Sequence, residues 1–108
     1  MTHYVLVDSR DPGEYGDGHW YRRLASDLKS RGHEVSLFLV ENGVFAARRR
    51  AGSGVLDPVK KAGVSVRADE FALRERGIDG NDLAPGITSA PLDFIIERMA
   101  GGANVMWR

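Results

Sequence analysis

Three short polar segments each follow an apolar run of the chain, and together they could bind a small polar ligand or a hydrated cation. They are Asp8-Ser9-Arg10, Glu41-Asn42-Gly43 and Asp69-Glu70. Their carboxylates, hydroxyl and amide suit such a ligand, and backbone N–H groups at helix starts favour anions. The candidate binding residues are Asp8, Ser9, Arg10, Asn42, Gly43 and Asp69. The alternative is that Asp8, Asn42 and Asp69 only cap helices and form turns, as these residue types often do.

The histidines offer acid–base chemistry, because an imidazole titrates near neutrality. We regard His19 as the best candidate, whereas His33 lies in a turn between a helix and a strand, where a structural role is expected. No serine or threonine lies in a nucleophile elbow, and nothing resembles a catalytic triad. Asp11, Glu14 and Asp17 precede His19, but their spacing matches no calcium loop. We therefore predict no metal and no cofactor.

A run of three arginines, Arg48-Arg49-Arg50, could clamp a phosphate or a sulfate. The Ala51-Gly52-Ser53-Gly54 that follows has no lysine partner and no preceding strand, so it is not a P-loop. A basic run at the end of a short helix is also favoured by the helix dipole. We prefer that explanation, with a contact between subunits as the second.

Composition narrows the class of protein. A chain of 108 residues fits one domain, 1–108, and 43% apolar with 28% charged residues is typical of a globular protein. Fifteen basic residues balance fifteen acidic ones, so neither nucleic acid nor an anionic membrane is an expected partner. The apolar run 35–40 is too short to cross a membrane, and the first residues lack signal-peptide blocks, which favours a cytoplasmic location. The chain has no cysteine, which excludes disulfides, thiolate metal sites and cysteine nucleophiles.

Apolar periodicity and glycine positions predict an alternation of strands and helices. We expect strands at 4–7, 34–40, 64–68, 87–88 and 103–107. We expect helices at 19–31 and 91–100 and shorter ones beginning near 43, 57 and 69. Asp17, Asp57 and Asp69 are the expected caps, and Gly32 is expected in a left-handed conformation at the end of the first helix. Leu92, Ile95, Ile96 and Met99 form an apolar stripe on the last helix.

This order predicts a three-layer α/β fold, Rossmann- or flavodoxin-like, with a mostly parallel five-stranded sheet and helices on both faces. Ligands of such sheets bind beyond the carboxyl ends of the strands, near a topological switch point. The three polar segments should converge there. Trp20, Tyr21, Phe45 and Phe71 are expected in the core or in a subunit interface rather than in a stacking platform for a ligand. The helices that begin at Gly43 and Asp69 are short, so we expect a monomer to leave apolar surface uncovered, which burial between subunits would remedy.

The sequence resembles the DsrE-like family of small α/β proteins linked to sulfur relay, and the resemblance covers nearly the whole chain. It is carried by Arg31-Gly32-His33-Glu34-Val35, Glu41-Asn42-Gly43-Val44, Lys61-Ala62-Gly63-Val64-Ser65-Val66, Arg76-Gly77-Ile78 and Asn104-Val105-Met106-Trp107. The resemblance implies the fold above and a homo-oligomer, either a trimer or a hexamer. In sulfur-relay members a cysteine follows the third strand; the matching position here is Asp69, and a second family cysteine would fall near Ala72.

A carboxylate cannot hold a transferable sulfur, so the relay chemistry of the family does not carry over to this chain. Three functional hypotheses remain. The first is a non-enzymatic binding or regulatory subunit for a small polar ligand or a partner protein. The second is an enzyme that works through Asp8, Asp69 or His19. The third is an accessory subunit of a sulfur relay whose thiol lies on another chain.

Overall fold

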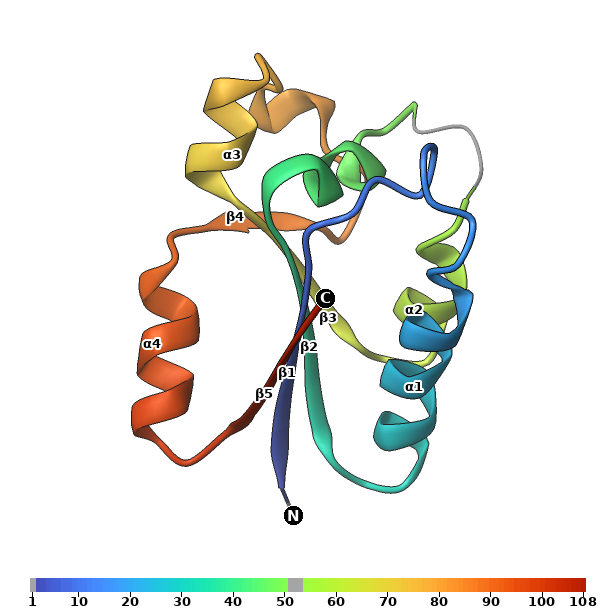
Figure 1. Ribbon diagram of the computed structural model, residues 1–108, viewed down its shortest axis with the longest axis vertical. Helices are drawn as coiled ribbons and strands as arrows, with labels where there is room; N and C mark the ends of the chain where they lie inside the picture. The colour runs from blue at the N-terminus through green and yellow to red at the C-terminus, as the bar shows by residue number, and fades with distance from the viewer. Residues whose placement is uncertain (1, 51–53) are drawn as a thin grey trace.

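Five parallel strands form one sheet in the order β4-β3-β2-β1-β5 (Figure 1). The computed structural model describes residues 2–50 and 54–108; residues 51–53, within the run that follows the arginines, lie outside the described part. The strands are β1 (His3–Asp8), β2 (Glu34–Leu39), β3 (Ser65–Asp69), β4 (Thr88–Ala90) and β5 (Asn104–Trp107). The predicted α/β fold with a parallel five-stranded sheet is confirmed.

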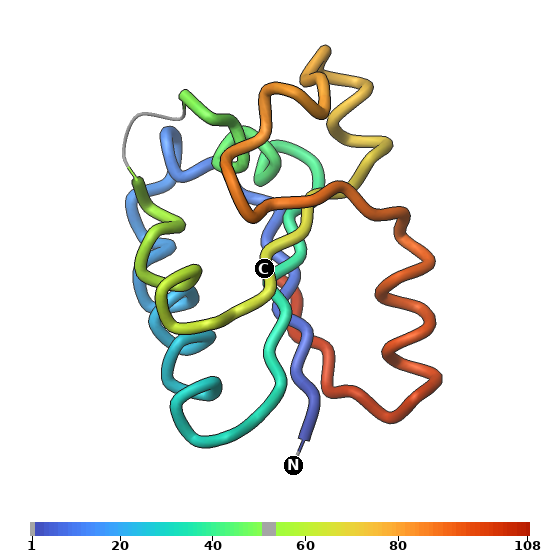
Figure 2. The backbone as a smooth tube through the Cα atoms, turned by 180° about the vertical axis from the view of Figure 1, so that it is seen from behind, coloured from blue at the N-terminus to red at the C-terminus, as the bar shows by residue number. Residues whose placement is uncertain are grey.

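Helices cover both faces of the sheet and its carboxyl end. Helices α1 (His19–Ser30) and α2 (Asp57–Lys61) lie on one face, and α4 (Asp93–Ala100) lies alone on the other (Figures 1 and 2). Helix α3 (Glu70–Glu75) and the 3-10 helices η1 (Glu41–Ala47) and η2 (Gly80–Asp82) follow the carboxyl ends of the strands. None of the helices in the described residues is both long and apolar enough to cross a membrane.

Alternation along β2 explains the two-sided core. Val35, Leu37 and Leu39 pack in the cluster on the α1 side of the sheet, while Phe38 and Val40 pack in the cluster on the α4 side. Side chains on a strand alternate between faces, so a strand that is apolar at consecutive positions must be covered on both. β1 is buried in the same way, with Val5, Leu6 and Val7 all inaccessible.

The two halves of the core are unequal. The cluster on the α1 side contains nineteen buried residues, whereas the cluster on the α4 side contains six. On α4 only Ile95 is buried, and Phe94 is half-buried beside it. The predicted apolar stripe is therefore divided: Ile95 faces the sheet, and Leu92, Ile96 and Met99 are exposed.

Several local details differ from the sequence prediction. Asp17 does not cap α1, whose N-cap is Gly18, and Asp57 does not cap α2, because it is already the first helical residue. The fourth strand begins at Thr88 rather than Ile87. Gly32 does adopt the expected left-handed conformation, with φ of 90°.

Candidate functional site

The ends of β1 and β2 meet at a close backbone contact. The N–H of Val40 donates to the carbonyl oxygen of Asp8 over 3.0 Å. A Cβ atom at position 43 would approach that same oxygen to 2.2 Å, so only glycine fits there. The first two predicted segments are therefore brought together, and Gly43 serves as the point of contact between η1 and β1.

The carboxylate of Asp8 is engaged by Arg108, the residue after β5. The Arg108 guanidinium lies 3.1 and 3.2 Å from the two Asp8 oxygens, and both side chains are almost fully buried. The backbone N–H of Arg10 also donates to Asp8, over 3.1 Å. Burial raises the pKa of the Asp8 carboxyl, and the Arg10 N–H and the Arg108 charge oppose that rise.

Two further contacts hold Arg108 in place. The Ser9 hydroxyl donates to the Arg108 carbonyl oxygen over 2.8 Å, and the Arg108 guanidinium also donates to Asp17. The bond to Arg108 explains why the Asp17 side chain does not cap α1, as the sequence had suggested. The crevice between the carboxyl ends of β1 and β5 is the switch point of this sheet, because the chain continues from β1 outward to β4 and returns beside β1 as β5. An internal ion pair occupies the place where a ligand was expected.

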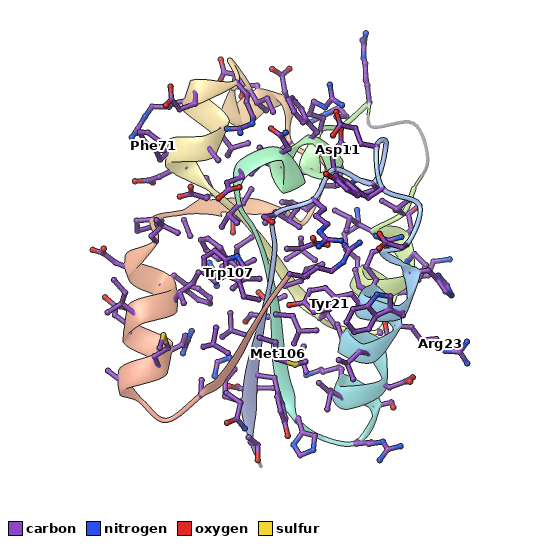
Figure 3. The ribbon with its side chains drawn as sticks, viewed as in Figure 1. Asp11, Tyr21, Arg23, Phe71, Met106 and Trp107 are labelled. Carbon is purple, nitrogen blue, oxygen red and sulfur yellow. The ribbon has the colours of Figure 1, made fainter. Side chains whose placement is uncertain are left out.

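Tyr21 closes this crevice from below, pointing from α1 towards the sheet near Met106 (Figure 3). Its hydroxyl donates to the carbonyl oxygens of Val7 (2.9 Å) and Met106 (3.0 Å) and so joins β1 to β5. Burial, reinforced by the nearby Asp8 charge, raises the pKa of the Tyr21 hydroxyl. The phenol stays protonated and acts as a structural donor.

Asn42, which follows β2 at the carboxyl edge of the sheet, forms a hydrogen bond with Arg76. It lies inside η1 and caps no helix; its Oδ1 accepts a hydrogen bond of 2.9 Å from Nε of Arg76, at the end of α3. Arg76 also donates to the carbonyl oxygen of Ala72 over 3.2 Å. The prediction of a cap at Asn42 is wrong, because its partner comes from a residue 34 positions later in the chain.

Asp69 caps α3, as predicted. One carboxylate oxygen accepts from the N–H of Ala72 over 3.2 Å. The other oxygen is buried and finds no hydrogen-bond partner among the described residues, and the same is true of Nε of Arg67, two positions earlier on β3. Of the six candidate side chains and backbones, Asp69 is the one with an unused buried acceptor.

The remaining candidates from the sequence are dispersed. Nδ1 of His33 accepts from the N–H of Thr2, and its ring packs edge-on against Tyr4, which is a structural role. His19 is exposed at the start of α1. Among the described residues, no hydrogen bond joins it to Asp8 or Arg108. Within residues 2–50 and 54–108 no group of three potential ligands is placed to hold a metal ion.

The largest hollow that we describe at this edge, about 780 Å³, is lined by residues that the sequence analysis treated separately. Its walls include Phe45, Asp82 and the arginines Arg48, Arg49, Arg50 and Arg76. We call it the arginine cavity. Arg48 donates from Nε to the carbonyl oxygen of Phe45, at the end of η1, which agrees with the helix-end explanation for the first arginine.

Sequence reasoning missed Arg76 and Arg108 as site residues. Arg76 entered only through the resemblance, and Arg108 was not considered. Both act on partners far away in the chain, and no local spacing indicates such a contact. A single arginine after a strand is a weak signal, since most arginines are solvated.

Comparison with solved structures supports the fold. The chain is similar over its full length to the protein of unknown function MTH1491 from Methanobacterium thermoautotrophicum, with 24% identity, a TM-score of 0.81 and all of that chain covered. It is equally similar to the ychN protein from E. coli, with 23% identity, a TM-score of 0.83 and full coverage of both chains. A protein of unknown function from Bacteroides thetaiotaomicron, BT1422, matches 98% of this chain and 94% of its own, with 15% identity and a TM-score of 0.76.

No protein-family model matches the sequence, and no curated protein is detectably similar to it. At these identities the likeness to solved structures establishes the fold alone. The chain is a parallel α/β protein whose fold is shared by proteins of unknown function.

Proposed function

We propose that this chain is a DsrE-like, non-enzymatic subunit of a cytoplasmic homo-oligomer that binds a small polar ligand or a partner protein in a regulatory role. The observation that carries the proposal is the apolar stripe of α4, which we define as Leu92, Ile96 and Met99. These side chains are 46%, 64% and 56% exposed. Trp107 of β5, 60% exposed, adds to the apolar surface on the α4 side of the sheet (Figure 3).

A second copy of this chain is the occupant that we propose for the stripe. One eight-residue helix covers the α4 face, and its buried cluster is small. Exposed apolar side chains that gather on one face are typical of an interface. The resemblance to a family of trimers and hexamers supports the same assignment.

Ligand binding is proposed at the carboxyl edge of the sheet, where Asp8, Ser9, Arg10, Asn42, Gly43 and Asp69 were expected to act. Asp8 and Ser9 both form hydrogen bonds with Arg108. One buried carboxylate oxygen of Asp69 has no hydrogen-bond partner among the described residues. The oxygen of Asn42 accepts from Arg76, so that the amide nitrogen of Asn42 can face a ligand. An edge with few free polar groups suits recognition better than proton transfer.

Native mass spectrometry of freshly purified protein tests both parts of the proposal. We expect a trimer or hexamer that carries a small-molecule adduct. Ile96→Glu should reduce it to a monomer, because a charge would be buried in the interface. Trp20 does not lie in the core: it is 55% exposed on α1, on the face of the sheet opposite α4 (Figure 1). Trp20→Glu is therefore the matched control and should leave the oligomer intact. A monomeric wild-type protein would overturn the homo-oligomer, and an oligomer without an adduct would overturn the ligand.

The buried oxygen of Asp69, which has no partner in residues 2–50 and 54–108, favours one alternative, an enzyme that uses this carboxylate. Asp69→Ala removes the cap of α3 as well as the carboxylate, so Asp69→Asn is the sharper test, because asparagine is also a good N-cap. An enzyme of this kind should lose turnover in both variants. Turnover that survives in Asp69→Asn would exclude Asp69 as its acid or base. An accessory role in a sulfur relay rests on the resemblance alone, since the thiol would belong to another chain.

A further inference from the structure

The arginine cavity concentrates positive charge in a chain whose charges otherwise balance. Four arginine residues and one acidic residue, Asp82, line its walls. The whole sequence has fifteen basic and fifteen acidic residues. Such a local excess produces a strong positive potential inside a concave surface, where low-dielectric walls focus the field.

The cavity is built on fixed backbone. Arg48 forms an antiparallel bridge with Leu83, and the N–H of Ala84 donates to the carbonyl oxygen of Ala47 over 2.9 Å. η2 carries a capping box between Asp79 and Asp82. The N–H of Arg49 also donates to the carbonyl oxygen of Asp82, so residues 47–49 are held against the segment 82–84.

The Phe45 ring makes cation–π contacts with two of the arginines, Arg48 and Arg76. The guanidinium carbon of Arg48 lies 4.8 Å from the centre of the Phe45 ring, and that of Arg76 lies 5.9 Å from the same centre. Arg76 is held in place by the hydrogen bonds that it donates to Asn42 and to the carbonyl oxygen of Ala72. Two like charges at one ring repel each other, and an anion between them would relieve that repulsion.

The four arginines keep free donors for that anion. Over the described residues, none of the ion pairs involves Arg48, Arg49, Arg50 or Arg76. Arg48 uses Nε for an oxygen of the protein, and Arg76 uses Nε and Nη1. Among the described residues this leaves the terminal N–H groups of Arg48 and those on Nη2 of Arg76 without a protein acceptor. Guanidinium groups bind phosphate through two parallel hydrogen bonds, and clusters of them are typical of phosphate recognition.

We propose that the arginine cavity binds the phosphate groups of a small, soluble phosphate-bearing molecule with at least two phosphates. The volume of about 780 Å³ lies within the range of small-molecule sites. A polynucleotide fits less well, because the acidic residue Asp82 lines the cavity, a second one, Asp79, caps η2, and the chain has no net positive charge. This inference does not depend on the proposed oligomer.

Isothermal titration with inorganic pyrophosphate tests the proposal. We expect saturable binding of one pyrophosphate per chain that weakens as salt is raised. Arg76→Gln and, separately, Arg48→Gln should each weaken binding by about tenfold or more, since each removes a charge-assisted donor. Arg48 is exposed, so its variant keeps the test valid if Arg76→Gln is poorly folded.

Arg23→Gln is the matched control, because Arg23 is exposed on α1 and points away from the sheet (Figure 3). It should bind pyrophosphate as the wild-type protein does. An absence of saturable binding, or an equal loss in Arg23→Gln, would overturn the proposal. Tighter binding of a single-stranded oligonucleotide than of pyrophosphate would overturn it in favour of nucleic acid. Native mass spectrometry of Arg76→Gln separates this result from the proposed function, because the oligomer should be unchanged.

Discussion

At the scale of single residues, the polar groups at the strand ends are mostly satisfied by one another. Asp8 is held by Arg108, Asn42 by Arg76, and Asp69 by the backbone of its own helix. Asp8 and Asp69 are buried, and buried polar groups cost free energy unless they are paired, so their contacts are conditions of folding as well as features of the edge. Asn42 is exposed, so its bond to Arg76 is a surface contact. Gly43 contributes no side chain, yet it sets how closely η1 approaches β1.

Gly43→Ala should lower the free energy of unfolding by about 1–3 kcal/mol, the usual cost of forcing an extra methyl group into a packed site. The clash would be with the backbone oxygen of Asp8, which cannot move without disturbing β1. Urea unfolding followed by circular dichroism measures the change.

Gly16→Ala is the control, since a Cβ at position 16 meets nothing within 4 Å. It should change stability by no more than about 0.5 kcal/mol. Equal stabilities of the two variants would show that η1 and β1 are not in the close contact described.

At the scale of elements, strands were predictable because their apolar pattern is local. Alternation along Val35–Val40 indicated which residues face each side, and the structure confirms the division. Caps were less predictable. Asp17 was available to cap α1, but it bonds to Arg108, 91 positions away. The same non-local competition explains Asn42 and the unforeseen arginine cavity, whose residues come from η1, from η2 and from the segments that follow η1 and α3.

Phe94 anchors α4 together with the buried Ile95, although the predicted apolar stripe did not include it. Its ring stacks on Phe38 with centroids 5.6 Å apart and planes at 9°. The guanidinium groups of Arg67 and Arg98 lie 4.8 and 4.9 Å from its centre. One residue thus joins the helix to β2 and β3.

Phe94→Ala should therefore lower the free energy of unfolding by about 3 kcal/mol and increase hydrogen exchange selectively in α4. Phe71→Ala provides the comparison, because Phe71 is 56% exposed and points away from the molecule on α3 (Figure 3). It should cost about 0.5 kcal/mol or less. If the two variants were equally stable, Phe94 would not be an anchor of α4.

At the scale of the whole molecule, the two faces of the sheet differ in how completely helices cover them. The α1 face is covered by two helices and a large cluster, whereas the α4 face relies on one short helix and exposes apolar side chains. A formal net charge of zero offers little electrostatic resistance to association. The sequence indicated that a monomer would leave apolar surface uncovered; where that surface lies became visible only in the fold.

If a second copy covers the α4 stripe, folding and association are linked, and stability must depend on protein concentration. Each tenfold rise in concentration should raise the free energy of unfolding by about 1 kcal/mol per chain, because only the folded chain associates. Thermal or urea unfolding over a hundredfold range of concentration measures this slope. Ile96→Glu should abolish it, since the stripe can then no longer be buried, while Trp20→Glu should retain it. A midpoint that is independent of concentration in the wild-type protein would mean that the stripe stays exposed in solution and that the homo-oligomer is wrong.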